Sequence, residues 1–310
     1  MSGEYERSER PLADAAVGER RHLINLAYRM LGSPAEAEDA VQEAYARWYA
    51  MPPAQRQAVA APGAWLTTVV SRVCLDVLGS ARVRRERYVG EWLPEPLPDR
   101  TEWLGGAGGG PADPADRITL DESVGMAFLV VLESMTPAER VVFVLHDVFR
   151  YPFPEIAAIV DRTPAACRQL ASSARRRVRA ARVPSAGQSQ QALAVRHFRE
   201  AWEAGDIEAL VGLLDPAATM VADGGGLVGA AVRPVEGGAR IARYLVLMAG
   251  KAPGLTLLER TVNGAPGLVA QRDGVTATVA ALDLVDGRIT RIWAVRNPEK
   301  LGRWTVPAGA

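Results

Sequence analysis

The stretch PEIAAIVDRTPAACRQLASSARRRVR, residues 154–179, has the layout of a helix-turn-helix, with two short apolar-faced helices separated by a break. Thr163 is a good N-cap and Pro164 suits the first helical position, so the second helix should begin there. The residues that the two helices would bury between them are Ile156, Ala157, Val160, Ala166 and Leu170. This stretch predicts a DNA-binding unit and sets the framework for the rest of the chain.

The same stretch concentrates positive charge: residues 162–182 hold seven arginines and no acidic residue, in a chain whose formal net charge is zero. In a major groove, arginine reads guanine and glutamine reads adenine. The candidates for this contact are Arg168, Gln169, Ser172, Arg175 and Arg176. Arg177, Arg179 and Arg182 are better placed for phosphates. A solvated basic helix end is the alternative, but the preceding apolar helix and turn favour DNA recognition.

Composition limits the remaining classes. No apolar run approaches the ~20 residues that cross a bilayer, and the charged opening segment lacks the apolar core of a secretory signal. Cys74 and Cys167 belong to no CxxC or His/Cys cluster, so neither a zinc site nor a disulfide framework is expected. We therefore predict a cytoplasmic protein that binds no membrane and needs no metal or cofactor.

The chain should divide into five segments. Residues 1–88 and 118–182 are helical units, and residues 190–310 combine helices with strand-like runs and hairpin turns, as in an α+β domain. LVGAAVRPV, residues 227–235, is among the expected strands, and PAERVVFVLHDVF, residues 137–149, is expected as one helix. Linkers are expected at 89–117 and 183–189. The first is rich in Pro and Gly, yet its Trp and Leu side chains indicate that it packs on something.

The first helical unit carries two charged features. Its helix PAEAEDAVQEAYARWY, residues 34–49, offers a polar flank to a basic partner, made of Glu38, Asp39, Gln42 and Glu43. A later helix, which starts near Ala64, ends in a basic cluster that suits a nucleic-acid backbone. The residues predicted to contact nucleic acid are Arg72, in the middle of this helix, and the end cluster of Arg82, Arg84, Arg85 and Arg87.

Residues 20–182 resemble the extracytoplasmic-function, or group 4, sigma factors of bacterial RNA polymerase. EAEDAVQEAYARWY (36–49) resembles the helix that binds core polymerase, and PGAWLTTVVSRVCLDVL (62–78) with RVRRER (82–87) resembles the segment that reads and melts the −10 element. Residues 135–179 resemble the segment that reads the −35 element. The resemblance implies a non-enzymatic initiation factor whose sigma2 domain binds the β′ clamp helices and whose sigma4 domain binds the β flap.

Three short motifs, YVGEWLPEP (88–96), DGGG (223–226) and NPEKL (297–301), resemble the subgroup of these factors with a fused C-terminal SnoaL-like or NTF2-like domain. The resemblance implies that this domain regulates the sigma domains in cis, with no separate anti-sigma factor required. The residues it assigns to that contact are Trp92, Leu93, Pro94, Asp223, Gly224, Gly225, Gly226, Asn297, Pro298, Lys300 and Leu301.

Two other functions stay open at this stage. A helix-turn-helix regulator with a ligand-sensing domain leaves the sigma2-like unit unexplained, although a small ligand of the C-terminal domain is a further candidate partner. An enzyme of the SnoaL type would need a general acid or base, for which Asp223, Asp283 and His197 are the candidates. No paired His–Asp pattern accompanies them, so we expect no catalytic site.

Overall fold

A computed structural model describes residues 19–85, 88–99, 125–181 and 187–304. The chain divides into two compact units. Of the described residues, the first unit contains the helices from residue 19 to residue 84 and from 131 to 181, and the second contains residues 88–99, residues 125–130 and the C-terminal domain. Each unit is described by itself.

The first unit opens with a helix over residues 19–31, followed by α2 (Pro34–Ala50), α3 (Pro53–Ala58) and α4 (Pro62–Arg85). Helix α2 starts at Pro34, where Ser33 caps it: the Ser33 Oγ accepts a hydrogen bond from the Glu36 amide at 3.4 Å. Trp48 of α2 packs against Trp65 of α4 with ring centroids 5.2 Å apart. This contact makes Trp65 part of the packing between the two helices.

The second group of helices comprises α6 (Met126–Glu133), α7 (Pro137–Phe143), a π-helical turn η2 (Val144–Val148), α8 (Phe153–Val160) and α9 (Pro164–Ala181). The helix expected over 137–149 is present, but it is α-helical only as far as Phe143 and continues to Val148 as a wider π-helical turn. Thr136 and Glu139 form a reciprocal capping box at the start of α7.

The turn between α8 and α9 has the expected helix-turn-helix form. Asp161 ends α8 in the left-handed conformation, at φ 52°, and the Thr163 Oγ accepts a hydrogen bond from the Ala166 amide at 3.1 Å. Ile156, Ala157 and Val160 are buried as predicted. On α9 the fully buried side chains are Cys167, Ala171 and Ala174, whereas Ala166 and Leu170 are only half-buried. The buried face of α9 is thus rotated by about one residue from the predicted one.

The second unit is built on a six-stranded sheet with strand order β2-β1-β6-β5-β4-β3. Its strands are β1 (Leu214–Asp223), β2 (Val235–Glu236), β3 (Leu255–Val262), β4 (Ala265–Arg272), β5 (Val275–Val285) and β6 (Arg288–Val295). β1 and β6 run parallel, and the other neighbours are antiparallel. The expected hairpin turns are confirmed at Asn263-Gly264, Asp273-Gly274 and Asp286-Gly287, where both residues of each pair have positive φ.

The strand expected over residues 227–235 is wrong. Only Val235 and Glu236 join the sheet, and the preceding residues form turns and irregular chain. This segment contains Gly229 and Pro234, which weaken a strand, and the Gly229 carbonyl accepts its hydrogen bond from the Arg296 side chain instead of from a neighbouring strand.

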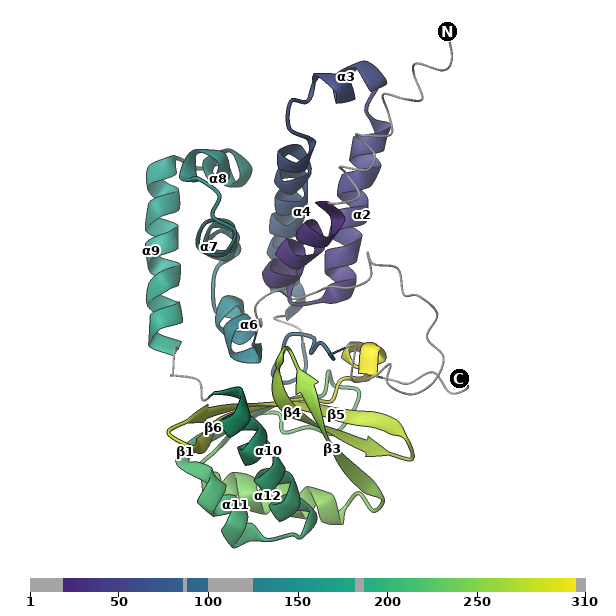
Figure 1. Ribbon diagram of the computed structural model, residues 1–310, viewed down its shortest axis with the longest axis vertical. Coiled ribbons are helices and arrows are strands. Elements are labelled where there is room, and N and C mark those ends of the chain that lie inside the picture. Colours follow the sequence, from purple (N-terminus) through teal and green to yellow (C-terminus); the bar gives the residue numbers. More distant parts are fainter. Residues whose placement is uncertain (1–18, 86–87, 100–124, 182–186, 305–310) are drawn as a thin grey trace. The chain divides into compact units, whose positions relative to one another are not determined.

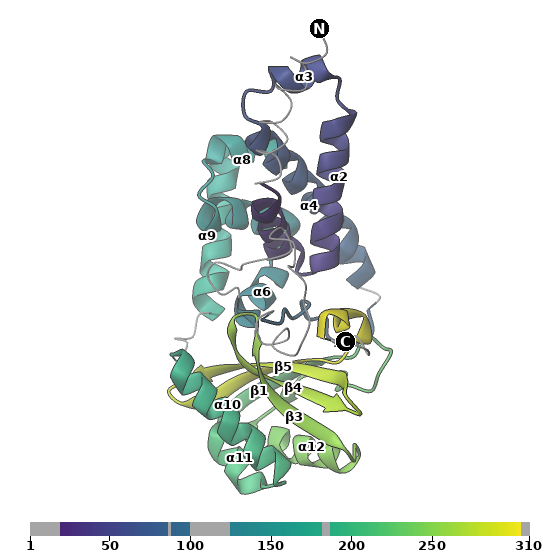
Figure 2. The same ribbon diagram turned by 45° about the vertical axis from the view of Figure 1, so that its right-hand side comes forward.

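Helices α10 (Gln188–Glu203), α11 (Ile207–Leu213) and α12 (Gly238–Gly250) cover one face of the sheet (Figures 1 and 2). They bury a cluster that includes Phe198, Leu245 and Ile292. A second cluster, on residues such as Val269 and Trp293, joins the sheet to the linker and to two short 3₁₀ turns, η3 (Pro298–Lys300) and η4 (Gly302–Trp304). The predicted α+β domain is confirmed, and the linker belongs to its core.

Candidate functional site

The linker is held by a buried carboxylate at the end of β1. Asp223 is fully buried, and its two oxygens accept four hydrogen bonds. The donors are the Tyr88 hydroxyl at 2.6 Å, the Leu93 amide at 2.9 Å, the Lys300 ammonium at 2.7 Å and the Gly225 amide at 3.0 Å. We call this cluster, with the 3₁₀ turn that carries Lys300, the linker seat. Every lone pair of the carboxylate is used, as a buried charge requires.

Lys300 also contacts the linker directly, at Leu93 and Trp92. Its Nζ donates to the Leu93 carbonyl oxygen at 2.6 Å as well as to Asp223, and it lies 4.0 Å from the centroid of the Trp92 ring. A cation above an aromatic ring gains electrostatic stabilisation, most strongly when water is excluded. The ion pair and the ring together compensate the cost of burying the ammonium group.

The DGGG turn brings Asn297 against the linker. Gly225 has a φ of +63°, and a Cβ on it would lie 2.5 Å from the Asn297 Nδ2, so a side chain is excluded on both grounds. The Asn297 Nδ2 donates to the Tyr88 hydroxyl at 2.9 Å, while its Oδ1 caps η3 by accepting from the Glu299 amide. Burial, and then the hydrogen bond to Asp223, raise the pKa of Tyr88, which keeps its hydroxyl protonated as a donor.

The linker continues as an added edge to the sheet. Leu97 and Asn263 exchange hydrogen bonds, from the Leu97 amide to the Asn263 Oδ1 at 3.2 Å and from the Asn263 amide to the Leu97 carbonyl at 2.9 Å. Trp304 is fully buried and donates from its Nε1 to the Pro96 carbonyl at 2.8 Å. A backbone bridge joins Pro98 to Val262 of β3. The linker is therefore bound over residues 88–99 and not at one point.

The structure brings residues of the three sequence motifs together on the linker side of the sheet. Six of the residues predicted for this contact form the hydrogen bonds and ring contacts described above: Trp92, Leu93, Asp223, Gly225, Asn297 and Lys300. Pro94 is buried beside Leu93, Leu301 belongs to the same apolar cluster, Pro298 starts η3, and Gly224 and Gly226 complete the turn. Sequence reasoning missed Tyr88, Asn263 and Trp304 as partners. Tyr88 is the first residue of the motif YVGEWLPEP, and its place in that motif was the one sequence feature that could have identified it as a partner.

The outer face of α9 is open. Arg168, Gln169, Ser172 and Arg176 are exposed, and their spacing places them along one side of the helix. Arg175 differs, because it is 39% exposed and its Nε lies 2.6 Å from the Asp147 carboxylate. Arg177 lies 3.9 Å from Glu139, and Arg179 is exposed near the helix end. Arg182 lies outside the described residues.

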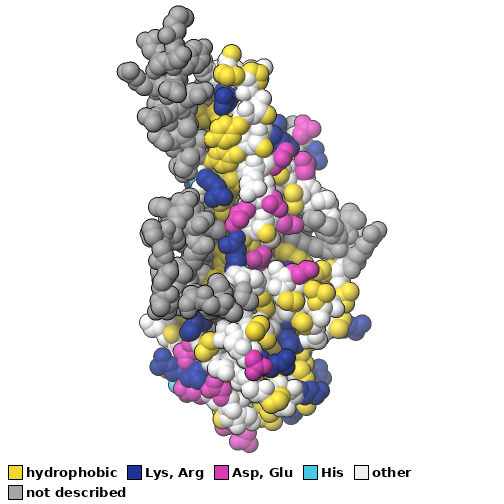
Figure 3. Space-filling model, turned by 90° about the vertical axis from the view of Figure 1, so that its right-hand side faces the viewer, with side chains coloured by type: hydrophobic (Ala, Val, Ile, Leu, Met, Phe, Trp, Pro, Cys, Tyr) yellow, Lys and Arg dark blue, Asp and Glu magenta, His cyan; other side chains and the backbone are white. Residues whose placement is uncertain are grey.

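The predicted polar flank of α2 is also presented to solvent. Asp39, Gln42 and Glu43 are exposed and Glu38 is half-buried. Glu43 forms a helical ion pair with Arg47 at 2.8 Å, between two side chains that are each about half exposed. Figure 3 shows acidic side chains beside apolar ones over the upper part of the face it draws, where α2 lies.

Comparisons with known proteins match these features. The family model for sigma-70 region 2 matches residues 18–87, and that for sigma-70 region 4 matches residues 125–178. The chain is 38% identical to the ECF RNA polymerase sigma factor SigJ of Mycobacterium tuberculosis, over 91% of this chain and 90% of that protein. The chain belongs to the ECF sigma factors of RNA polymerase.

Two further matches extend over the C-terminal domain. A probable ECF sigma factor, SigI of M. tuberculosis, is 36% identical over 94% of this chain and 95% of its own length. The crystal structure of M. tuberculosis SigJ superposes with a TM-score of 0.73 at 34% sequence identity, covering 93% of this chain and 98% of that one. The sigma2, sigma4 and C-terminal domains thus share their order with a relative of known structure.

Four of the five basic residues assigned to the −10 element lie on α4 of this sigma factor. Arg72 is exposed, and its Nη2 donates to the Ala158 carbonyl of α8 at 2.9 Å. Arg82, Arg84 and Arg85 lie in the last turn and a half of α4, where the structure describes the backbone alone. Arg87 lies outside the described residues. In this form of the sigma factor, Arg72 therefore bridges sigma2 to the helix-turn-helix of sigma4.

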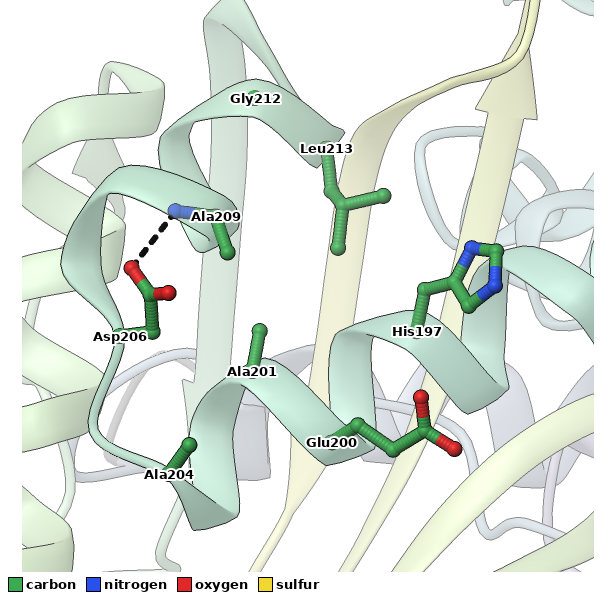
Figure 4. A pocket seen from close by; sticks show the side chains of 8 residues that line it. All are labelled: His197, Glu200, Ala201, Ala204, Asp206, Ala209, Gly212 and Leu213. Atoms are coloured by element: carbon green, nitrogen blue, oxygen red, sulfur yellow. Dashed lines mark hydrogen bonds between the residues drawn. The ribbon is translucent and has the colours of Figure 1, made fainter.

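The candidate acid and base residues are not brought together. His197 is exposed on α10, in a surface pocket of about 540 Å³ whose other polar side chains are Glu200 and Asp206 (Figure 4). Asp206 there caps α11 through the Ala209 amide. Asp223 is occupied in the linker seat, and Asp283 pairs with Arg291 at 3.3 Å, with its pKa raised by burial.

Within the described ranges, no group of three His, Cys, Asp or Glu side chains is arranged to hold a metal ion. Cys74 and Cys167 are both buried free thiols. In the part of the chain that the structure describes, no helix is long and apolar enough to cross a membrane.

Proposed function

We propose that this sigma factor directs promoter-specific initiation in the cytoplasm and that its C-terminal domain restrains it by binding the linker between sigma2 and sigma4. The observation that carries this proposal is the Asp223 carboxylate, whose four donors include two from the linker, Tyr88 and Leu93. Sigma2 and sigma4 must be free to reach two separate promoter elements. A linker bound along residues 88–99 leaves less chain to span them.

The seat is suited to a switch with two states. Releasing the linker exposes the Asp223 and Lys300 charges together, and removal of one partner alone leaves the other unpaired. Intermediate positions of the linker lose both the hydrogen bonds and the burial of Leu93 and Trp304. The linker is therefore expected to be either held or free, and anything that binds one state better shifts the population.

The remaining surfaces define the proposed partners. The exposed residues of the α2 flank suit a basic surface of core polymerase, which we assign to the β′ clamp helices, and sigma4 is assigned to the β flap. The outer face of α9 would read the −35 element through Arg168, Gln169, Ser172 and Arg176, with Arg175 freed from Asp147. Arg72 and the end of α4 would contact the −10 element. No separate anti-sigma factor is needed if the linker seat supplies the restraint.

Run-off transcription with purified core polymerase tests the proposal, on promoter DNA selected in vitro by the full-length protein with polymerase. Asp223→Asn preserves the size of the side chain but removes the charge that pairs with Lys300. We expect several-fold more transcript from this variant than from the unaltered protein, at equal affinity for core polymerase. Glu208→Gln, at an exposed position on α11, is the matched control and should change nothing.

A chain ending at Arg182 gives a second, independent comparison. Transcript from this chain and from the full-length protein would establish initiation by sigma2 and sigma4, and more transcript from the shorter chain would agree with restraint. Equal yields from the full-length protein and Asp223→Asn, with both folded, would remove the regulatory part of the proposal and leave the initiation function intact.

A further inference from the structure

A second hollow of the C-terminal domain lies on the helix side of the sheet, away from the linker seat. It has a volume of about 510 Å³ and is bounded by the end of α11 and the starts of β1, α12 and β6. Val211, Leu214 and Pro216 supply apolar lining. A hollow of this size accommodates a small molecule, and its apolar lining favours a ligand with a hydrocarbon part.

Three arginines from two elements border the same hollow. Arg240 and Arg243 come from the first turns of α12, and Arg288 is the first residue of β6. None of the three forms an ion pair with a carboxylate among the described residues, and Glu236 is the one acidic side chain among those that line the hollow. Arg288 is positioned by a hydrogen bond of 3.3 Å to the Leu214 carbonyl.

Close packing of α12 on β1 keeps this arrangement in place. A Cβ on Gly238 would lie 2.7 Å from the Asp215 carbonyl oxygen, so the first turn of α12 can lie against β1 because that residue is glycine. The same turn carries Arg240 into the border of the hollow. Three guanidinium groups share only one carboxylate neighbour at this hollow, Glu236, so its border keeps a net positive charge that an anion held between the arginines would offset.

We propose that this hollow binds a small organic anion, with a phosphate or carboxylate head between the arginines and a short apolar tail against Val211 and Pro216. The planar fork of arginine matches both heads, since it donates two parallel hydrogen bonds to either. This site is separate from the linker seat and does not depend on it. The two sites are nonetheless joined by β1 and β6, which both begin at the hollow and end at the seat.

Titration calorimetry on the full-length protein tests the proposal with n-hexyl phosphate as the probe. Inorganic phosphate represents the head alone, 1-hexanol represents the tail alone, and hexanoate exchanges the head for a carboxylate. We expect hexyl phosphate to bind at least about tenfold more tightly than inorganic phosphate, and 1-hexanol not to bind measurably. A comparison of hexanoate with hexyl phosphate then identifies which head the site prefers.

The double variant Arg240→Gln/Arg243→Gln should weaken hexyl phosphate binding by at least about tenfold. Both side chains are exposed, so the variant is expected to melt at the temperature of the unaltered protein. Arg272→Gln, at the exposed end of β4, is the control and should bind as before. Equal binding by the double variant and the unaltered protein would overturn the proposal, as would no binding of either anion with a tail. A short single-stranded oligonucleotide can be added as a competitor of hexyl phosphate. If it displaced hexyl phosphate more effectively than inorganic phosphate does at the same phosphate concentration, the hollow would be assigned to nucleic acid instead.

Discussion

The linker seat and the outer face of α9 are both charged, but they satisfy their charges in opposite ways. In the seat, a carboxylate with no exposed surface receives four donors from within the same unit. On α9, Arg168, Arg176 and Arg179 are exposed and lack carboxylate partners among the described residues. A region that completes its own hydrogen bonds stabilises the fold. A region whose hydrogen-bond donors stay exposed contributes free energy only when it binds an external partner.

The difference also separates how the two regions respond to solvent conditions. Buried charges are screened little by salt, whereas contacts between exposed arginines and phosphates weaken steeply as salt increases. The seat should therefore hold its linker over a wide range of ionic strength, while DNA binding by α9 should depend strongly on it. Substitutions in the two regions can test this contrast.

The largest effect is expected for Asp223→Ala, which removes the counter-charge of the Lys300 ammonium and leaves the Leu93 amide buried without its acceptor. Breaking one partner of a buried pair costs about 3–5 kcal/mol, so the second unit should unfold at a clearly lower urea concentration. Glu208→Ala on the exposed side of α11 should stay within about 0.5 kcal/mol of the unaltered protein. A loss as small for Asp223→Ala as for the control would mean that the seat is solvated.

Arg168→Ala should lower the affinity of the polymerase complex for its own promoter by about 1–3 kcal/mol if Arg168 reads a base. Its guanidinium carbon lies 5.7 Å from the centroid of the Phe153 ring, a contact that orients it at the surface. Fluorescence anisotropy on the selected promoter, and on one with the −35 element scrambled, measures the loss. An equal loss on both DNAs would reassign Arg168 to phosphate binding.

Arg179→Ala should act differently, since that side chain is expected to contact phosphate. Binding should weaken about equally on both DNAs, and the slope of log K against log salt should decrease by about 1. Arg196→Ala, at an exposed position on α10 outside the proposed interface, should leave the slope unchanged. A loss confined to the intact −35 element would place Arg179 at the bases.

Asp147→Asn tests Arg175, the residue among those predicted to contact DNA bases that forms an ion pair with Asp147 within the described part of the chain. Partly exposed ion pairs contribute about 0–1 kcal/mol, so release of Arg175 should raise promoter affinity by no more than a few-fold. The same titration, with Arg175→Ala in parallel, measures it. Lower affinity after Asp147→Asn would indicate that the pair positions α9 instead of competing with DNA.

The sequence allowed the helix-turn-helix to be predicted because its signals are local: a cap, a proline and an apolar period lie within 26 residues, 154–179. The motifs of the seat were found through a family resemblance, but their partners were not. Tyr88 and Asp223 are 135 residues apart, and no periodicity links them. Arg175 is drawn toward the protein by its ion pair with Asp147, which lies on the π-helical turn η2. Local helix propensity does not predict such a turn. Residues 227–235 were misassigned because their apolar content was given more weight than Gly229 and Pro234.

The smallest expected effect concerns pH and the packing of sigma2 against sigma4 within the first unit. His22 stacks edge-on against Phe149 and lies 3.3 Å from the Tyr151 hydroxyl. Burial lowers its pKa below the usual 6.5, with Glu19 opposing and Arg29 adding to that shift. A histidine whose folded pKa is depressed contributes stability above its unfolded pKa, and this contribution is lost as pH falls through the folded value.

The melting temperature of the first unit should therefore decrease from pH 7.5 to pH 5.5 more in the unaltered protein than in His22→Gln. His197→Gln, on the exposed face of α10, is the matched control and should retain the full dependence. If His22→Gln kept the same pH dependence as the unaltered protein, the contact with Phe149 and Tyr151 would be insensitive to the charge on His22. The packing of sigma2 on sigma4 would then resemble the linker seat, with its charges balanced internally, more than the open face of α9.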